Sequence, residues 1–128
     1  MNEIPILLTN YWPLDEDGQF VPWNYQADAT PHLTANGTEL SRELEWLVAA
    51  CIDEWNSIGW TTAVSFYYDG EYRRVLCEDE FGAPGYWNPF YHPRWGWVIP
   101  VDVFTAEPVY EIIYLWDREV GESYCCRQ

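Results

Sequence analysis

Aromatic side chains are the feature of this chain that most limits how it can fold. Nine Trp, ten Tyr and five Phe stand among 128 residues, and 48% of all residues are hydrophobic. A chain this rich in large apolar side chains can bury enough surface to offset the entropy lost on folding, so intrinsic disorder is not expected. The length corresponds to one domain, which buries roughly 65–70% of the surface that its unfolded chain exposes. The sequence therefore predicts a single folded domain over residues 1–128.

The net charge sets the second limit. Six Arg and no Lys stand against 21 Asp and Glu, which gives a formal net charge of −15. Binding of nucleic acid or anionic lipid depends on basic side chains that displace counterions, so neither is expected as a direct partner. A basic protein surface is the partner that this charge favours. The other explanation is that the acids serve solubility alone.

Hydropathy and cysteine usage bear on location. No stretch approaches the roughly 20 apolar residues that span a bilayer, and the apolar run 4–8 has no basic residue before it. We therefore expect neither a membrane anchor nor a secretory leader, and a cytoplasmic location, that of the host cell if a phage encodes the chain. Cys51 lies in a helical pattern and Cys77 in a strand pattern, where cysteine is usually a small buried hydrophobe. Such usage fits a reducing compartment.

The clearest predicted element is a helix from about Thr38 to Ser57. Its apolar residues recur at helical spacing: Leu40, Leu44, Leu47, Val48, Cys51, Ile52 and Trp55. Asn36 followed by Glu39 is typical of a capping box, and Thr38 is the alternative cap. Gly59 is a natural left-handed stop.

Strand patterns follow this helix. Residues 60–68 and 71–78 are rich in β-branched and aromatic side chains, and Asp69-Gly70 between them is a type I′ turn signal, so they predict a hairpin. Residues 98–104 and 109–116 resemble a second strand pair joined through residues 105–108.

Three further positions qualify this strand assignment. Pro108 could instead begin a helix in place of the last strand. Pro100 cannot donate a ladder hydrogen bond, which places its strand at an edge or the residue at a bulge. The run Ile4–Thr9 is a further candidate strand.

Two long Pro-rich segments, residues 10–37 and 79–97, show no regular pattern and are expected to be functional loops. The expected fold class is therefore α+β. It consists of one main amphipathic helix packed on a four- to five-stranded antiparallel sheet, with two long aromatic, Pro-rich loops.

Motifs that carry catalysis are missing from the sequence. It has no phosphate-binding glycine loop and no nucleophile elbow, and the lack of Lys removes Schiff-base chemistry. Cys and His do not stand at zinc-binding spacing, and the calcium-loop pattern before Gly18 fails because Pro13 occupies the first ligand position. Carboxylate pairs for glycoside hydrolysis are too easily drawn from 21 acids to indicate that reaction. We expect no enzymatic activity, no metal and no cofactor.

Carboxylates gather on the outer flank of the predicted helix. The candidate partner-binding residues there are Glu39, Glu43, Trp46, Asp53 and Glu54. Acids at i and i+4 repel by a few tenths of a kcal/mol, which suggests that the face has a use, although an ordinary solvated face is an equal alternative. Acids one helical turn apart are roughly 5–6 Å from each other, of the same order as successive phosphates, so a row of them can occupy a groove lined with Arg and Lys. Two more clusters extend the candidate set: Asp15, Glu16 and Asp17, and Glu78, Asp79 and Glu80.

The second loop is dense in aromatic residues. Its rings are Tyr86, Trp87, Phe90, Tyr91, Trp95 and Trp97. Rigid aromatic side chains are preferred anchors of protein interfaces, whereas the alternative is that the loop folds back over its own rings. We expect one or two rings to stay exposed and take Trp87, Tyr91 and Trp95 as candidate partner-binding residues.

The acidic stretch Glu39–Glu54, then Gly59 and the hairpin at Asp69-Gly70, together with the charge of −15, resembles small acidic phage proteins that disarm bacterial defence, namely DNA-mimic inhibitors and type I anti-CRISPR proteins. The resemblance is at class level, covers the middle third of the chain and includes no specific motif. It implies a non-enzymatic inhibitor of anti-CRISPR or anti-restriction type that binds the basic nucleic-acid-binding surface of a host defence complex or nuclease.

Two other functions fit the same sequence. One is an immunity protein that neutralises a toxin nuclease. The other is a carbohydrate-binding module with Trp87, Trp95 and Trp97 as a stacking platform.

Overall fold

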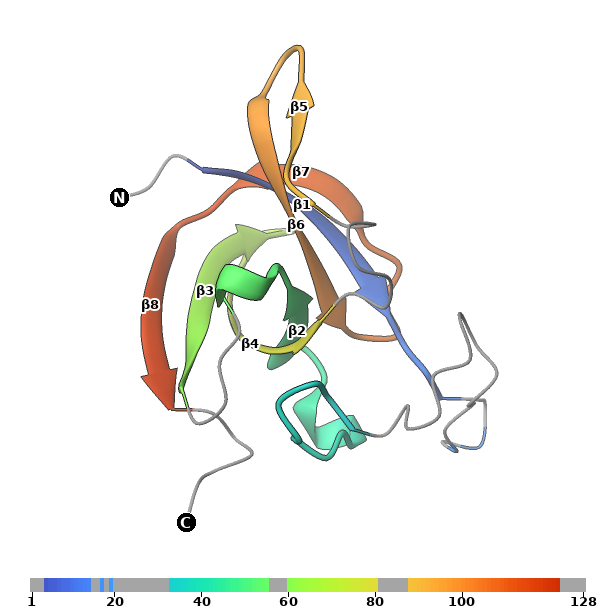
Figure 1. The fold of residues 1–128 in the computed structure, drawn as a ribbon. Coiled ribbons are helices and arrows are strands. Elements are labelled where there is room, and N and C mark those ends of the chain that lie inside the picture. Colours follow the sequence, from blue (N-terminus) through green and yellow to red (C-terminus); the bar gives the residue numbers. More distant parts are fainter. Residues whose placement is uncertain are drawn as a thin grey trace.

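The computed structural model describes residues 4–14, 17, 19, 33–55, 60–80 and 88–122 of the chain (Figure 1). Within these ranges, the backbone alone is described for Asp53, Trp60, Thr61, Glu80, Gly121 and Glu122. The strands are β1 (Pro5–Tyr11), β2 (Val48–Cys51), β3 (Trp60–Tyr68), β4 (Glu71–Glu80), β5 (Phe90–His92), β6 (Gly96–Phe104), β7 (Tyr110–Tyr114) and β8 (Asp117–Glu122). Two short 3-10 turns, η1 (Arg42–Leu44) and η2 (Asp53–Trp55), flank β2.

The strands form one mixed sheet in the order β7-β1-β6-β2-β4-β3-β8, and β5 pairs with β6 beside this path. β1 runs parallel to β6, and β2 runs parallel to β4, whereas the other neighbours are antiparallel. The two edge strands follow each other in the chain. Leu115 N–H donates to the Ile4 carbonyl and Trp116 N–H to the Ser65 carbonyl, each at 2.8 Å. The sheet therefore curls until residues 110–122 join its two edges, as Figure 1 shows.

The concave side of this curled sheet holds the main core. Alternate residues of a strand point to opposite faces, so one set from each strand turns inward. The inward residues that are fully buried include Ile6, Leu8, Val64, Phe66, Val75, Cys77, Val101 and Val103. A smaller cluster of Leu40, Val48 and Phe104 packs on the outer side, where the Trp12 ring stacks on Phe104 with centroids 4.8 Å apart.

The prediction of a helix over residues 38–57 is wrong, and with it the α+β class. The described residues contain strands and 3-10 turns, and residues 48–51 of the expected helix form β2. β2 lies between β6 and β4 and is buried along its whole length. A continuous apolar run of this kind suits a strand covered on both faces as well as it suits a helix. Trp46, with φ of 62°, also breaks any helix that would cross it.

The predicted hairpin at Asp69-Gly70 is confirmed. Tyr68 pairs with Glu71, and both turn residues have positive φ, at 52° and 79°, as a type I′ turn requires. The strand predicted at Ile4–Thr9 is also confirmed, as β1.

Strands were correctly predicted near 98–104 and 109–116, but they do not pair with each other. β1 lies between β6 and β7. Pro100 lies in β6 at the point where this strand changes partners. The residues before it, 96–98, pair with β5, and residues 102–103 after it pair with β2. This step between two partners is a position where a missing N–H is tolerated.

Cys51 on β2 and Cys77 on β4 are fully buried, as expected, but they are joined by a disulfide with a Cα–Cα distance of 5.5 Å. Disulfides persist mainly in oxidising environments, so this bond does not favour the predicted reducing compartment. Among the residues described, none belongs to a helix long and apolar enough to cross a membrane.

Candidate partner-binding surfaces

The candidate residues of the expected helix do not share one face. Glu39 lies in an isolated bridge with Leu33, Glu43 in η1 and Glu54 in η2, and all three acids are exposed. Trp46 is instead buried in the main core. The Tyr68 ring stacks on it at 5.7 Å, and the Arg73 guanidinium lies 4.3 Å from its ring centroid. This burial removes Trp46 from the predicted partner surface.

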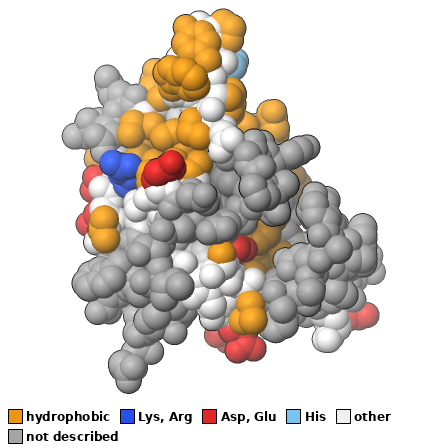
Figure 2. All heavy atoms as spheres, in the orientation of Figure 1, with side chains coloured by type: hydrophobic (Ala, Val, Ile, Leu, Met, Phe, Trp, Pro, Cys, Tyr) orange, Lys and Arg blue, Asp and Glu red, His pale blue; other side chains and the backbone are white. Residues whose placement is uncertain are grey.

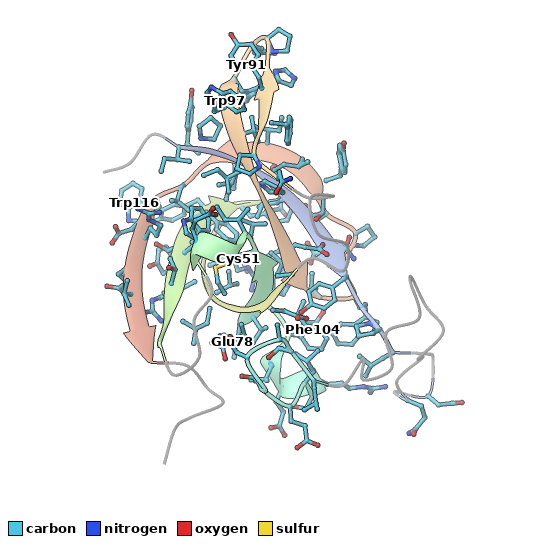
Figure 3. The ribbon with its side chains drawn as sticks, in the orientation of Figure 1. Cys51, Glu78, Tyr91, Trp97, Phe104 and Trp116 are labelled. Carbon is cyan, nitrogen blue, oxygen red and sulfur yellow. A yellow bond between two sulfur atoms is a disulfide. The ribbon has the colours of Figure 1, made fainter. Side chains whose placement is uncertain are left out.

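Two acids of the 78–80 cluster form hydrogen bonds within the protein. A register shift between Ala49 and Ala50 makes Glu78 the extra residue of a bulge in β4. Glu78, which is labelled in Figure 3, is fully buried and accepts a hydrogen bond from the Thr38 hydroxyl. Its neighbour Asp79 accepts the Ala35 N–H at 2.9 Å. These contacts fasten residues 34–38 to the sheet and leave Glu78 unavailable to a partner.

A second acid, half-buried Asp102, lies in the same row as Asp79. The register places Thr9, Asp102, Ala50 and Asp79 in one row across four neighbouring strands. The Thr9 hydroxyl donates to Asp102 Oδ1 at 2.7 Å. Burial raises the pKa of Asp102 to about 6, with the Thr9 hydrogen bond opposing and the Asp79 charge adding to the effect. The small side chain of Ala50 between the two carboxyl groups allows this row to form.

Other candidates fall partly outside the described residues. Asp17 is exposed. Asp15, Glu16 and Trp87 lie outside the described residues, as do the side chains of Asp53 and Glu80.

A row of aromatic rings lies on the outer face of β4 and β3 and continues to Trp116, the residue before β8. Tyr67 pairs with Tyr72 across the hairpin, and their ring centroids are 5.4 Å apart. The Trp116 ring meets Tyr67 edge to face, also at 5.4 Å. The three side chains are 53%, 51% and 44% exposed for Tyr67, Tyr72 and Trp116. Edge-to-face contacts fix the rings relative to one another, so the row is preformed.

Charged side chains border this row. Arg74 on β4 forms an ion pair with Glu119 on β8 across β3, at 2.7 Å. The small side chains of Ser65 and Ala63 on β3 leave room for this contact. Asp117 pairs with Ser65 and is exposed. Exposed Asp69 lies in the adjoining turn. We call Tyr67, Tyr72, Trp116, Asp69, Asp117 and Glu119 the aromatic–acidic face. Its three charged members are acids, and Arg74 beside them pairs with Glu119.

A second aromatic surface is the β5–β6 hairpin, residues 90–98, which we call the arm. It projects beyond the curled sheet, and hydrophobic side chains gather over it in Figure 2. Tyr91 pairs with Trp97, and these side chains are 63% and 65% exposed. Trp95 is half-buried against Tyr114, with centroids 5.1 Å apart. The prediction of an irregular loop over residues 79–97 is wrong here, because residues 90–92 and 96–97 belong to the paired strands β5 and β6. Rings are nevertheless exposed, as expected, with Tyr91 and Trp97 more open than Trp95.

The sequence did not predict the aromatic–acidic face, although two of its three rings can be inferred from the predicted hairpin. Tyr67 and Tyr72 stand symmetrically about the Asp69-Gly70 turn, so the predicted hairpin already makes them cross-strand neighbours. The approach of Trp116 has no such local signal, because it depends on β8 pairing with β3.

Comparisons with protein-family models, with curated proteins and with solved structures found no match for this chain.

Proposed function

We propose that this chain is a non-enzymatic acidic inhibitor, of the anti-CRISPR or anti-restriction type, that docks on the basic nucleic-acid-binding surface of a defence complex or nuclease. The observation that carries the proposal is the aromatic–acidic face, where the exposed Tyr67 ring contacts those of Tyr72 and Trp116. Asp69, Asp117 and Glu119 border these rings. This face replaces the helix flank as the docking surface.

Uncompensated charge supports a basic partner. Since the chain has 21 acids and six Arg, at least 15 acids lack a basic side chain of their own even if every Arg pairs with one. The ion pairs between described residues are Arg73 with Glu71 and Arg74 with Glu119. The excess negative field attracts a cationic surface over long range and speeds encounter, and added salt weakens this effect.

The aromatic rings supply the binding energy that exposed charges alone do not. Exposed ion pairs contribute at most about 1 kcal/mol each, so charge gives rapid but short-lived contact. Trp and Tyr dominate the energetics of protein interfaces because they bury large rigid areas at little entropic cost. Trp116 and Tyr67 are such anchors, with the acids as their rim.

The test is surface-immobilised binding to a purified Cascade-type complex or basic nuclease, followed at several salt concentrations. We expect association to slow steeply between about 0.05 and 0.5 M salt, because the Debye length shortens over this range. An Asp69→Asn, Asp117→Asn, Glu119→Gln variant should lower the association rate and the salt dependence, whereas Trp116→Ala should mainly raise the dissociation rate.

The matched control neutralises exposed acids elsewhere, at Glu39, Glu43 and Glu54. It lowers the net charge by the same amount and should have the smaller effect. Binding that does not respond to salt would refute electrostatic docking. A larger loss in the control than in the triple variant would refute the aromatic–acidic face as the docking surface.

A further inference from the structure

Charge is divided unevenly along this chain. Residues 81–101 contain no Asp or Glu and include a single Arg, whereas all 21 acids and the other five Arg lie outside this segment. The arm belongs to this acid-free segment. The surface it presents is therefore chemically different from the rest of the protein.

The exposed rings of the arm lie on one side of the hairpin. Tyr91 and Trp97 are directly opposed on β5 and β6, and their ring centroids are 5.8 Å apart at an interplanar angle of 76°. Figure 3 shows both side chains at the far end of the hairpin, well away from Trp116. The neighbouring pair, Phe90 with Val98, has the opposite orientation, and Val98 is fully buried. One side of the arm thus anchors it while the other side is open.

The turn of the arm is held in place by its own side chains. His92 Nδ1 accepts the N–H groups of Arg94 and Trp95, at 3.0 and 3.3 Å. This arrangement leaves Nε2 of the neutral imidazole as a donor toward its surroundings. The Trp95 ring packs on Tyr114 of β7 and ties the arm to the body. The rings are therefore preorganised, and binding to them costs little ordering entropy.

We propose that the open side of the arm is a second binding site, distinct from the aromatic–acidic face, and that its ligand is an uncharged saccharide chain. The proposal goes beyond the inhibitory function and does not depend on it. The C–H face of a pyranose ring is apolar and slightly positive, which matches the negative face of an indole or phenol. Sugar hydroxyl groups around that face can bond with the Tyr91 hydroxyl, which belongs to the open side.

Charge selects this ligand over others. A polyanion is repelled by the net charge of −15, and a basic protein is drawn to the acids, all of which lie outside residues 81–101. Insertion of the arm into a bilayer would carry exposed Arg94, at the turn, into the lipid first, which is costly. A neutral saccharide meets neither penalty.

The experiment titrates the full chain by calorimetry and tryptophan fluorescence with cellohexaose, N-acetylchitohexaose and xylohexaose. We expect at least one to bind with a Kd between about 0.01 and 1 mM. Trp97→Ala should weaken that binding about tenfold or more, and Tyr91→Ala should weaken it less. Because no ion pair is involved, the affinity should stay the same between about 0.05 and 0.5 M salt.

The matched control is Trp116→Ala, which removes an exposed indole from the aromatic–acidic face and should leave saccharide binding unchanged. Phosphatidylcholine vesicles serve as the competing probe. The proposal is overturned if none of the three saccharides binds at about 5 mM, a concentration well above the expected range. It is also overturned if Trp97→Ala binds saccharide as tightly as the parent. The same holds if the parent binds vesicles but no saccharide and the Trp97→Ala variant loses vesicle binding. The two proposals are separated if Trp116→Ala loses salt-sensitive nuclease binding but still binds saccharide.

Discussion

The half-buried carboxyl group of Asp102 leads to a quantitative prediction about stability. Asp102 lies in the row Thr9–Asp102–Ala50–Asp79 and receives a hydrogen bond from the Thr9 hydroxyl. Replacing it by Asn preserves the shape and the Oδ1 acceptor but removes the ionisable group. Any difference in stability that depends on pH then reports the cost of a negative charge at this position.

The magnitude follows from the pKa of Asp102. Burial raises it from its usual 3.8 to about 6. At 1.36 kcal/mol for each pKa unit, the difference corresponds to about 3 kcal/mol. Because the folded state binds this proton more tightly than the unfolded state, the contribution is fully present below about pH 4 and is lost as the pH rises through about 6. Ionised Asp102 therefore destabilises the native protein at neutral pH.

Urea unfolding of the parent and of Asp102→Asn between about pH 3 and pH 8 measures this effect, and the difference between the two curves cancels the other acids. We expect the variant to gain about 3 kcal/mol relative to the parent between pH 4 and pH 7. Asp117→Asn, the same change at an exposed acid, is the matched control. A difference curve for Asp102→Asn no steeper than that of Asp117→Asn would refute the reasoning.

Three further predictions concern local features. Gly70→Ala should destabilise the protein by about 1–2 kcal/mol, because φ of 79° is unfavourable for a residue with a Cβ, and an unchanged thermal midpoint would contradict this. Reduction of the Cys51–Cys77 disulfide, which spans a sequence separation of 26, should lower the free energy of unfolding by about 3–4 kcal/mol, as measured by denaturation with and without reductant. Thr38→Val should cost about 1–3 kcal/mol, since it removes the hydroxyl donor to buried Glu78; Thr38→Ser keeps the donor and should cost less.

Where local chemistry decides structure, the sequence was a good guide. The Asp69-Gly70 turn requires two residues with positive φ, and Asp and Gly meet this requirement, so the hairpin could be located within a residue or two. The strands β1, β6 and β7 were recognisable from their β-branched residues.

The wrong predictions concern residues whose structure depends on contacts distant in the sequence. Residues 48–51 are apolar on both faces, and the neighbours that cover both faces, β6 and β4, come from later in the chain. Nothing within residues 38–57 indicates those neighbours, so helical spacing was the strongest local signal. The prediction that Trp46 and Glu78 lie at the surface fails for the same reason, since their burial depends on contacts with Arg73 and Thr38.

The aromatic–acidic face could be only half anticipated. Tyr67 and Tyr72 follow from the hairpin, but the third ring depends on the closure of the sheet by residues 110–122. The exposure of Tyr91 and Trp97 agrees with the expectation that some rings of the second loop stay uncovered.

The position of β1 has a consequence for how the protein is made. Residues 5–11 leave the ribosome before their partners in the sheet, which are residues 99–104 and 110–114. β1 must therefore remain unpaired, with its apolar side chains uncovered, until residues 99–114 have also emerged. Such long-range pairing slows folding compared with helical proteins of the same size and exposes the nascent segment to aggregation.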